Sequence, residues 1–303
     1  MQDKLYVITV FFNPSNFTSL LRNYHVFKEN ISKYHNIELI TIELSFNNQF
    51  QIEGQNVYRL NSNSIMWQKE RLINYGISLL PDSAKYFCWS DCDLIFLHDN
   101  WVDLCLEKLQ TNDVVQCFKK VFFAPKHEFQ FKPIYKSQQG VIWQYKIHKN
   151  WLMRRKNKEL PFSAPGFIFA STVDFFKKIP CLYDKNIVGS GDTFMVDIFL
   201  NSWEIHGYAE KFTNGMKTDM QNYVQTVLDI NPKVDYIPVD IMHLYHGAVA
   251  DRRYMERHDI IKKYDFDPSV DIQLVNNVYE WSSNKTGMHE EIKQYFYDRK
   301  EDL

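Results

Sequence analysis

The sequence predicts an α/β fold built on a mostly parallel sheet with helices on both faces. Its 303 residues are 45% hydrophobic and 24% charged, as in a globular chain of one large domain or two small ones. Apolar runs typical of buried strands alternate with segments in which apolar residues recur every three or four positions. This strand, helix, strand order favours parallel pairing, because a crossover helix returns the chain to the starting edge of the sheet.

Strands are expected where β-branched and aromatic residues gather between turn residues. The first such run is closed by Asn13-Pro14, which cannot continue a central strand. Continuous apolar runs of this kind are typical of strands that are buried on both faces of a sheet. In chain order, the predicted strands are 5–12, 37–44, 57–60, 86–93, 113–118, 165–170 and 234–241.

Helices are expected where apolar residues share one face at helical spacing. The clearest case begins at Leu20, because Leu20, Tyr24 and Phe27 recur at intervals of three and four. The next predicted helix has polar candidates for its N-cap at residues 62–64 and Pro81 just beyond its end. In chain order, the predicted helices are 20–34, 64–80, 101–109, 173–178, 194–200, 216–227 and 290–299.

The cysteines and the apolar runs bear on the compartment. The five cysteines are odd in number, lie mostly in apolar runs and lack C-x-x-C spacing. Free, buried thiols in a reducing compartment are therefore expected. No apolar stretch approaches the roughly 20 residues of a membrane span, and the first residues lead into a strand instead of a cleavable signal. We expect a cytoplasmic protein.

The segment 119–158 differs in composition from the rest of the chain. It holds eleven Lys or Arg residues and one acid, a net charge of +10 in a chain of net charge −2, so the remainder is −12. Aromatic residues are interleaved with this charge. Cations and aromatic faces together suit a polyanion with stackable groups, including nucleic acid. The alternative is a solvated basic hairpin whose aromatic side chains belong to the core.

Two carboxylates, Asp91 and Asp93, stand where the predicted strand 86–93 ends. Residues two apart on an extended chain project to the same face, so both can point at one cation while Cys92 points away. Oxygen ligands suit Mg²⁺ or Mn²⁺, and ligands of open α/β sheets bind at the carboxyl ends of the strands. The alternative is a surface turn with two solvated aspartates.

Two later motifs carry further candidates. Asp192 follows a glycine-rich turn at the start of a predicted helix, where it either faces a ligand or only caps the helix. His243 and His246 follow the last predicted strand, and two imidazoles at this spacing can reach one metal. Arg252 and Arg253 come close behind, and guanidinium groups are suited to a diphosphate.

The order of these motifs resembles that of metal-dependent glycosyltransferases of the GT-A fold, over most of the chain. The His-x-x-His spacing is similar to the metal-binding region of the β1,4-galactosyltransferase group and its microbial and viral relatives. The resemblance implies a Mn²⁺ or Mg²⁺ site formed by Asp93 and His246, with His243 as a weaker ligand. It also implies that Asp91 lies toward the sugar or ribose. Asp192 becomes the candidate general base of an inverting reaction, although relatives often show tandem acids where Thr193 stands here.

In such a fold, the first strand end at Asn13 and the helix that carries Arg71 would flank the nucleotide, with Arg252 and Arg253 near the diphosphate. The resemblance implies a single domain, 1–303. It would comprise a nucleotide-sugar half (1–118), a basic aromatic insertion (119–160), an acceptor and metal half (161–264) and a C-terminal extension (265–303).

The expected activity is transfer of a hexose from a nucleoside diphosphate sugar, such as a UDP-hexose, to a glycan or an anionic polymer. The +10 segment keeps a second acceptor open, namely DNA with hydroxymethylated pyrimidines, whose base would have to be exposed or flipped. Two other classes also remain. A metal-dependent nucleotidyltransferase would use the paired aspartates without needing the histidines. A non-catalytic nucleotide-sugar binding module would need Asp93 and His246 but would tolerate loss of Asp192.

Overall fold

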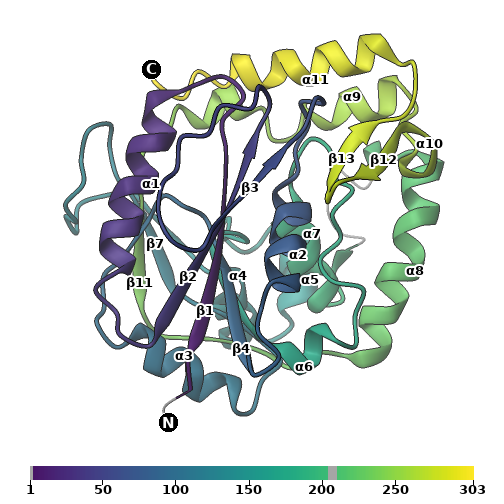
Figure 1. Ribbon diagram of the computed structural model, residues 1–303. Coiled ribbons are helices and arrows are strands. Elements are labelled where there is room, and N and C mark those ends of the chain that lie inside the picture. Colours follow the sequence, from purple (N-terminus) through teal and green to yellow (C-terminus); the bar gives the residue numbers. More distant parts are fainter. Residues whose placement is uncertain (1–2, 204–209) are drawn as a thin grey trace.

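A seven-stranded sheet forms the centre of the molecule in the computed structural model, which describes residues 3–203 and 210–303 (Figure 1). Its strand order is β10-β6-β9-β4-β1-β2-β3. All neighbours pair in parallel except β9, which is antiparallel to both β4 and β6. The predicted mostly parallel sheet is confirmed. The strands are β1 (Leu5–Phe12), β2 (Ile37–Ser45), β3 (Val57–Asn61), β4 (Tyr86–Ser90), β6 (Val114–Gln116), β9 (Ile168–Thr172) and β10 (Val234–Tyr236).

Helices cover both faces of this sheet, as the sequence predicts. In β1, Leu5 and Val7 belong to one core cluster and Tyr6 and Ile8 to another, because successive side chains of a strand point to opposite faces. The cluster that contains Leu5 and Val7 also includes residues of α1 and α3. The cluster that contains Tyr6 and Ile8 includes residues of α2, α7 and α8. The bounds of these helices are α1 (Thr18–Ile31), α2 (Lys69–Ser78), α3 (Trp101–Leu109), α7 (Gly191–Phe199) and α8 (Asn214–Ile230).

A second, four-stranded sheet in the order β5-β11-β7-β8 brings distant parts of the chain together. β11 (Asp240–His243) runs antiparallel to β5 (Leu94–Phe96) and parallel to β7 (Lys120–Phe123), which pairs with β8 (Ser137–Gln139). In this register His243 is opposite Leu94, the residue that follows Asp93. The second sheet therefore places the end of β11 beside the first of the two sequence motifs.

The C-terminal part packs over one end of the sheet. It comprises α9 (His258–Lys263), α10 (Pro268–Asp271), the hairpin of β12 (Ile272–Val275) and β13 (Val278–Trp281), and α11 (Thr286–Asp298). Figure 1 shows α11 along the top, with the last residues beside the start of α1. Asp302 accepts hydrogen bonds there from the backbone N–H groups of Thr18 (2.9 Å) and Ser19 (2.7 Å).

Two predicted elements begin later than expected. The helix predicted from residue 64 starts at Lys69, because the residues before it contact β13: the Trp281 N–H donates to Ser64 Oγ, and Gln68 Nε2 donates to the Tyr279 carbonyl. The strand predicted from residue 165 starts at Ile168, since Phe167 has a φ of 77° that a strand does not allow. A contact distant in sequence overrides the local pattern in the helix, and a left-handed backbone conformation does so in the strand.

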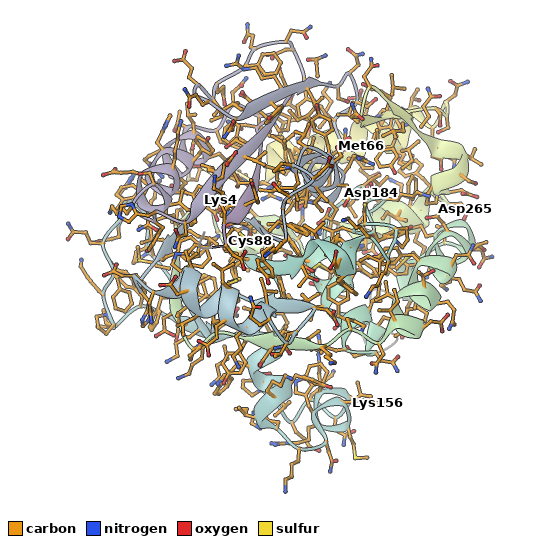
Figure 2. All side chains as sticks on the ribbon, turned by 60° about the horizontal axis from the view of Figure 1, so that its bottom comes forward. Lys4, Met66, Cys88, Lys156, Asp184 and Asp265 are labelled. Atoms are coloured by element: carbon orange, nitrogen blue, oxygen red, sulfur yellow. The ribbon has the colours of Figure 1, made fainter. Side chains whose placement is uncertain are left out.

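The segment 119–160 contributes to both sheet and surface. Its first part forms β7 and β8, and its second part forms α4 (Val141–Ile147) and α5 (Trp151–Lys156), in a lobe whose outer end carries Lys156 (Figure 2). The short helix α6 (Val173–Phe176) follows β9.

The five cysteines are free thiols. Within residues 3–203 and 210–303, no helix has both the length and the apolar character needed to cross a bilayer.

Candidate functional site

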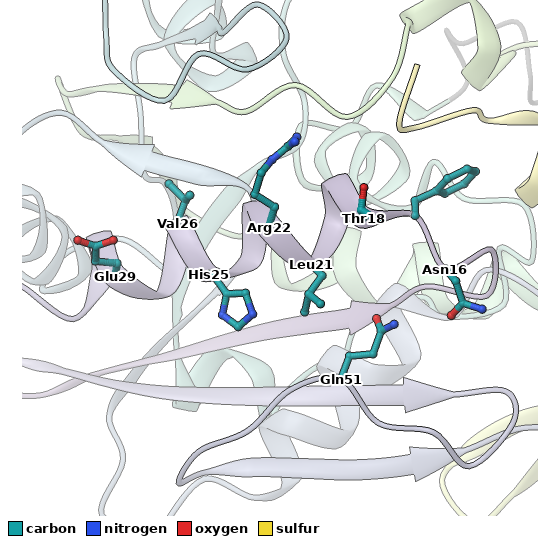
Figure 3. Close-up of a pocket in the computed structure, with 9 residues that line it drawn as sticks. Asn16, Thr18, Leu21, Arg22, His25, Val26, Glu29 and Gln51 are labelled. Carbon is teal, nitrogen blue, oxygen red and sulfur yellow. The ribbon is translucent and has the colours of Figure 1, made fainter.

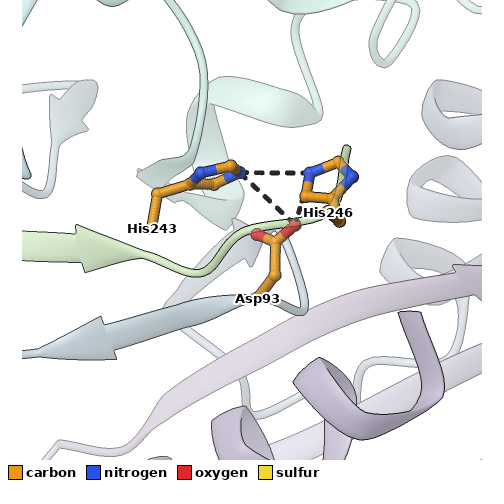
Figure 4. A group of neighbouring side chains, drawn as sticks. All are labelled: Asp93, His243 and His246. Atoms are coloured by element: carbon orange, nitrogen blue, oxygen red, sulfur yellow. Dashed lines mark hydrogen bonds and ion pairs between the residues drawn. The ribbon is translucent and has the colours of Figure 1, made fainter. Parts of the chain in front are cut away.

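A buried triad of Asp93, His243 and His246 lies where the two sheets meet (Figure 4). β11 ends at His243, and the Leu244 N–H donates to the Asp93 carbonyl at 2.8 Å, which fixes the two chain segments against each other. Asp93 Oδ2 lies 3.0 Å from His246 Nε2 and 3.5 Å from His243 Nε2. The two Nε2 atoms are 3.2 Å apart. Three ligand atoms therefore converge on one point.

The triad fits a divalent cation. Asp93 Oδ1 is buried without a hydrogen-bond partner among the described residues, and the two Nε2 atoms face each other at 3.2 Å beside Asp93 Oδ2. A bound cation would satisfy these lone pairs together. One carboxylate and two imidazoles suit Mn²⁺, and the same donor set also serves Fe²⁺ and Zn²⁺. The identity of the metal is thus a question for measurement.

The protonation of the triad follows from its surroundings. Burial alone would raise the pKa of Asp93, but His243 and His246 hold it well below its usual range. Burial lowers the pKa of His243, against the opposing effect of Asp93. The pKa of His246 is raised, since Glu301 and Asp93 outweigh burial and the nearby Arg252. An ionised Asp93 and a neutral His243 are the states that bind a metal.

Two charged residues surround His246. Arg252 Nη2 lies 3.0 Å from His246 Nε2, so a guanidinium group adjoins the position that the triad leaves for a cation. On the other side of the ring, Glu301 Oε2 is 3.4 Å from Nδ1. Glu301 is itself paired with Arg299, and despite burial Arg299 and His246 lower the pKa of Glu301 to about 2.

The two aspartates of the D-x-D motif are separated instead of facing one cation, which corrects the sequence prediction. β4 ends at Ser90, so the extended geometry that would align them stops before Asp91. The Asp91 N–H donates to the Phe167 carbonyl at 2.8 Å, and the Asp91 carboxylate forms an ion pair with Lys69 at the start of α2. Asp93 alone joins the histidines.

Asp91 belongs to a second group, the Lys69 cluster, made up of Lys69, Glu70, Asp91 and Asp192. Burial alone would lower the pKa of Lys69, but Asp91, Asp192 and Glu70 together raise it above its ordinary value. Burial raises the pKa of Glu70 to about 7, with Lys69 opposing and Asp192 adding to the shift. The cluster thus combines one cation with three carboxyl groups.

Two glycines make room for this cluster. A Cβ on Gly166 would lie 2.1 Å from Asp192 Oδ2, and a Cβ on Gly191 would lie 2.2 Å from the Glu70 carboxyl group. The turn that leads to Asp192 has Ser190 at a φ of 75°, and Arg257 Nη2 donates to its hydroxyl at 2.5 Å. Asp192 accepts the Thr193 N–H at 2.9 Å through Oδ1 only, so Oδ2 stays directed toward Gly166.

The remaining predicted residues have other partners. Asn13 closes the turn before α1, donating to the Phe17 carbonyl and accepting the Phe17 N–H, both at 2.9 Å. Arg71 pairs with Asp184 at 3.2 Å, and the exposed Arg253 pairs with Asp298 at 2.8 Å. The structure therefore brings Arg252 to the triad, whereas Arg71 and Arg253 form ion pairs with other residues. That both would face a nucleotide stays a prediction without support from these contacts.

A surface pocket of about 480 Å³ runs along the outer side of α1 (Figure 3). Arg22, His25 and Gln51 are among its lining residues, whereas no residue of the triad or of the Lys69 cluster lines it. The convergence of ligand atoms, and not the size of this pocket, therefore locates the candidate site.

Sequence reasoning missed Lys69, Glu70 and Glu301. Lys69 and Glu70 had a signal: they are adjacent charges at the start of a helix whose next residues are core. Glu301 had none, because nothing near it in the sequence indicates that it contacts a histidine 55 positions earlier.

No family model and no curated protein matches the chain. Solved structures do. A Drosophila β1,4-galactosyltransferase 7 catalytic domain with xylobiose is 13% identical over 93% of each chain, with a TM-score of 0.40. A mutant of that enzyme with manganese, UDP-Gal and xylobiose is 14% identical, with a TM-score of 0.39, and the match spans 77% of this chain but 64% of that one.

Glucosyl-3-phosphoglycerate synthase from Mycobacterium tuberculosis, with Mn²⁺, UDP-glucose and phosphoglyceric acid, is 12% identical over 93% of this chain and 88% of that chain, with a TM-score of 0.41. TM-scores below 0.5 are too low to assign a function. In architecture, the chain is an α/β protein similar to solved glycosyltransferases of the GT-A fold.

Proposed function

We propose that this protein is a metal-dependent glycosyltransferase that moves a sugar from a nucleoside diphosphate sugar to an acceptor hydroxyl. The observation that carries the proposal is the buried Asp93, His243, His246 triad with the Arg252 guanidinium 3.0 Å from His246. A cation held by the triad would stabilise the negative charge that develops on the leaving diphosphate. Arg252 is placed to share that charge through hydrogen bonds to phosphate oxygens.

The Lys69 cluster supplies groups for the sugar and the acceptor. Asp91, held by Lys69, is the proposed partner of donor hydroxyls. Asp192 is the proposed general base, through the Oδ2 atom that faces Gly166. It would accept the proton of the acceptor hydroxyl while that oxygen bonds to the anomeric carbon and the bond from this carbon to the diphosphate oxygen breaks. Attack from the face opposite the diphosphate inverts the anomeric centre.

Two observations separate this proposal from the other classes. A nucleotidyltransferase would use paired aspartates for its metals, but Asp91 is neutralised by Lys69 and only Asp93 joins the triad. A purely binding module has no need of a carboxylate such as Asp192, for which Gly166 leaves room beside Lys69 and Asp91. We propose a UDP-hexose as donor and a glycan or an anionic polymer as acceptor, with modified DNA as the second candidate acceptor.

The test is a series of thermal melts with nucleotides and nucleotide sugars, each with Mn²⁺, Mg²⁺, Fe²⁺, Zn²⁺ or a chelator. A ligand at 100 times its dissociation constant adds about 2.7 kcal/mol to the free energy of unfolding. For a chain of this size that raises Tm by roughly 5 °C. The shift should require a metal and vanish in Asp93→Ala but not in the control Asp82→Ala. No shift with any nucleotide would contradict the proposal.

A further inference from the structure

The α4–α5 lobe, residues 141–162, is a surface feature that the proposed reaction does not use. The lobe leaves and rejoins the sheet region at one place, since Gly140 and Ala164 form a bridge and the Val141 N–H donates to the Ala164 carbonyl at 3.1 Å. Its inner side is anchored by the buried Trp151 and by Arg155, which pairs with Asp197 of α7 at 2.7 Å. The outer side is therefore not required to hold the lobe in place.

The outer side of the lobe combines exposed apolar groups with exposed cations. Phe162 is 79% exposed and Met153 64%, and Ile147 and Leu152 are each 45% exposed. The lobe holds six Lys or Arg residues and one acid, a net charge of +5. That acid, Glu159, is paired with Arg154 at 3.5 Å. The exposed lysines among the cations are Lys146, Lys149, Lys156 and Lys158.

We propose that the α4–α5 lobe docks on an anionic lipid surface. Aliphatic and aromatic side chains that enter the headgroup region, next to lysines that attract anionic lipids, are the two components of interfacial binding. Nucleic acid fits less well: Phe162 and Tyr145 offer planar faces, but the other exposed apolar side chains, Met153, Leu152 and Ile147, have none on which a base can stack. A second copy of the chain fits less well too, since two such lobes would carry the same positive charge.

The place of the lobe in the fold suggests what docking achieves. The chain leaving the lobe runs from Ala164 to Gly166, where a Cβ would lie 2.1 Å from Asp192 Oδ2. The acceptor side of the proposed active site thus lies next to the lobe along the chain. This part of the inference rests on the proposed function: docking would bring the acceptor side toward an acceptor carried on a lipid headgroup.

The test is sedimentation with vesicles, without nucleotide or acceptor, so that its outcome does not depend on the proposed function. We expect binding to phosphatidylcholine vesicles that contain about one third phosphatidylglycerol and much weaker binding to pure phosphatidylcholine. Lys149→Ala with Lys156→Ala, and separately Met153→Ser with Phe162→Ser, should each weaken binding roughly 10-fold or more. The control is Lys33→Ala with Val270→Ser, which removes an exposed lysine and an exposed apolar side chain elsewhere.

Three results would overturn the docking proposal. The first is vesicle binding that is absent or equal in both lobe variants and the control. The second is salt-dependent binding of a 30-nucleotide single strand that only the lysine variant loses, which would identify nucleic acid as the partner. The third is a dimer in light scattering that Met153→Ser with Phe162→Ser dissociates, which would identify a second copy.

A separate set of contacts concerns the last residues of the chain. Glu301 is buried, and its Oε1 accepts from Arg299 Nε at 2.5 Å while Oε2 lies 3.4 Å from His246 Nδ1. The turn after His246 packs directly on this segment, because a Cβ on Gly247 would lie 2.9 Å from Glu301 Cα. The Tyr245 hydroxyl donates to the Leu303 carbonyl at 2.8 Å.

The geometry points to Glu301 as a positioning residue for the metal site. A carboxylate close to Nδ1 of a histidine favours the tautomer that carries its proton on Nδ1 and leaves the Nε2 lone pair for a metal. In His246 that lone pair is on the side of Asp93 and His243. The last residues of the chain would therefore set the affinity of a site whose three ligands all lie elsewhere in the sequence.

The test is titration of Mn²⁺ alone by calorimetry, in Glu301→Gln and in the control Glu290→Gln, an exposed acid on α11. Loss of a partner of this kind typically weakens metal binding 10–100-fold, and the control should bind as the wild type does. Nitrogen NMR of His246 should show a shift of the tautomer away from Nδ1–H in Glu301→Gln. Unchanged affinity and tautomer in a variant that keeps its Tm would overturn the assignment.

Discussion

The metal triad and the α4–α5 lobe hold charged groups under opposite conditions. In the triad, Asp93 and two imidazoles are buried, so each lone pair that lacks a partner is costly. In the lobe, the lysines stay in water and cost little, while apolar side chains that burial would favour remain exposed. Each region suits a different kind of ligand: the convergent ligand atoms of the triad suit a cation, and the exposed apolar and basic side chains of the lobe suit an anionic surface.

The largest effect is expected from Asp192→Asn. If Asp192 is the general base, the amide cannot accept the acceptor proton, and turnover should fall by about 10²–10⁴. The thermal shift with nucleotide and metal should persist, because Asp192 is not part of the triad. Steady-state kinetics with acceptor checks this, with Asp82→Asn as the control. A turnover rate near that of the wild type would contradict the role of Asp192 as the general base.

A smaller loss is expected from Gly166→Ala. The new Cβ would meet Asp192 Oδ2 at 2.1 Å and force the carboxylate to move. A displacement of about 1 Å in a catalytic group can lower the rate roughly 100-fold. The control is Gly287→Ala, whose Cβ meets the end of the Tyr264 side chain at 2.9 Å, far from the site. Equal turnover in both variants would mean that the position of Asp192 is not critical.

The pH dependence of stability should reveal Glu70. Because burial raises its pKa to about 7 from 4.5, the folded state holds this proton more tightly than the unfolded state does. The stability from that proton is complete below about pH 4.5 and is lost as the pH rises through 7, by on the order of 3 kcal/mol. Glu70→Gln should remove this loss, so its Tm relative to the wild type should be higher at pH 8 than at pH 5. Parallel curves would contradict the raised pKa.

The smallest effect is expected on the stability of the lobe. Met153→Ser with Phe162→Ser should change the free energy of unfolding by no more than about 0.5 kcal/mol per site, since both side chains are largely exposed. Urea denaturation measures this. A loss of several kcal/mol would show that these side chains pack in the folded chain, and the contrast between the two regions would then disappear.

The sequence was most informative where a pattern is local. The strand β1 and the spacing of His243 and His246 follow from residue types within a few positions, and the structure places both histidines beside Asp93. The direction in which a side chain points depends also on residues that are distant in sequence. Asp91 turns to Lys69 because β4 stops at Ser90, and no spacing rule indicates where a strand stops.

The partners of exposed or half-buried cations were the least predictable part. Arg71 was expected near a nucleotide, but Asp184 lies within 3.2 Å of it from a loop more than a hundred positions later. Arg252 and Arg253 are neighbours in sequence, yet one lies against His246 and the other pairs with Asp298. Which carboxylate an arginine meets depends on how distant segments pack, and composition does not contain that information.

The contact between Glu301 and His246 bears on how the protein should be produced for any of these experiments. β1 and β4 are parallel, and their carboxyl ends point toward the site. Leu5, at the start of β1, therefore lies at the opposite end of the strands. A purification tag placed before residue 1 would therefore start far from the metal ligands. A polyhistidine tag after Leu303 would start three residues after Glu301 and bring competing imidazoles close to the triad, so titrations with such a fusion would count the metal sites of the tag as well.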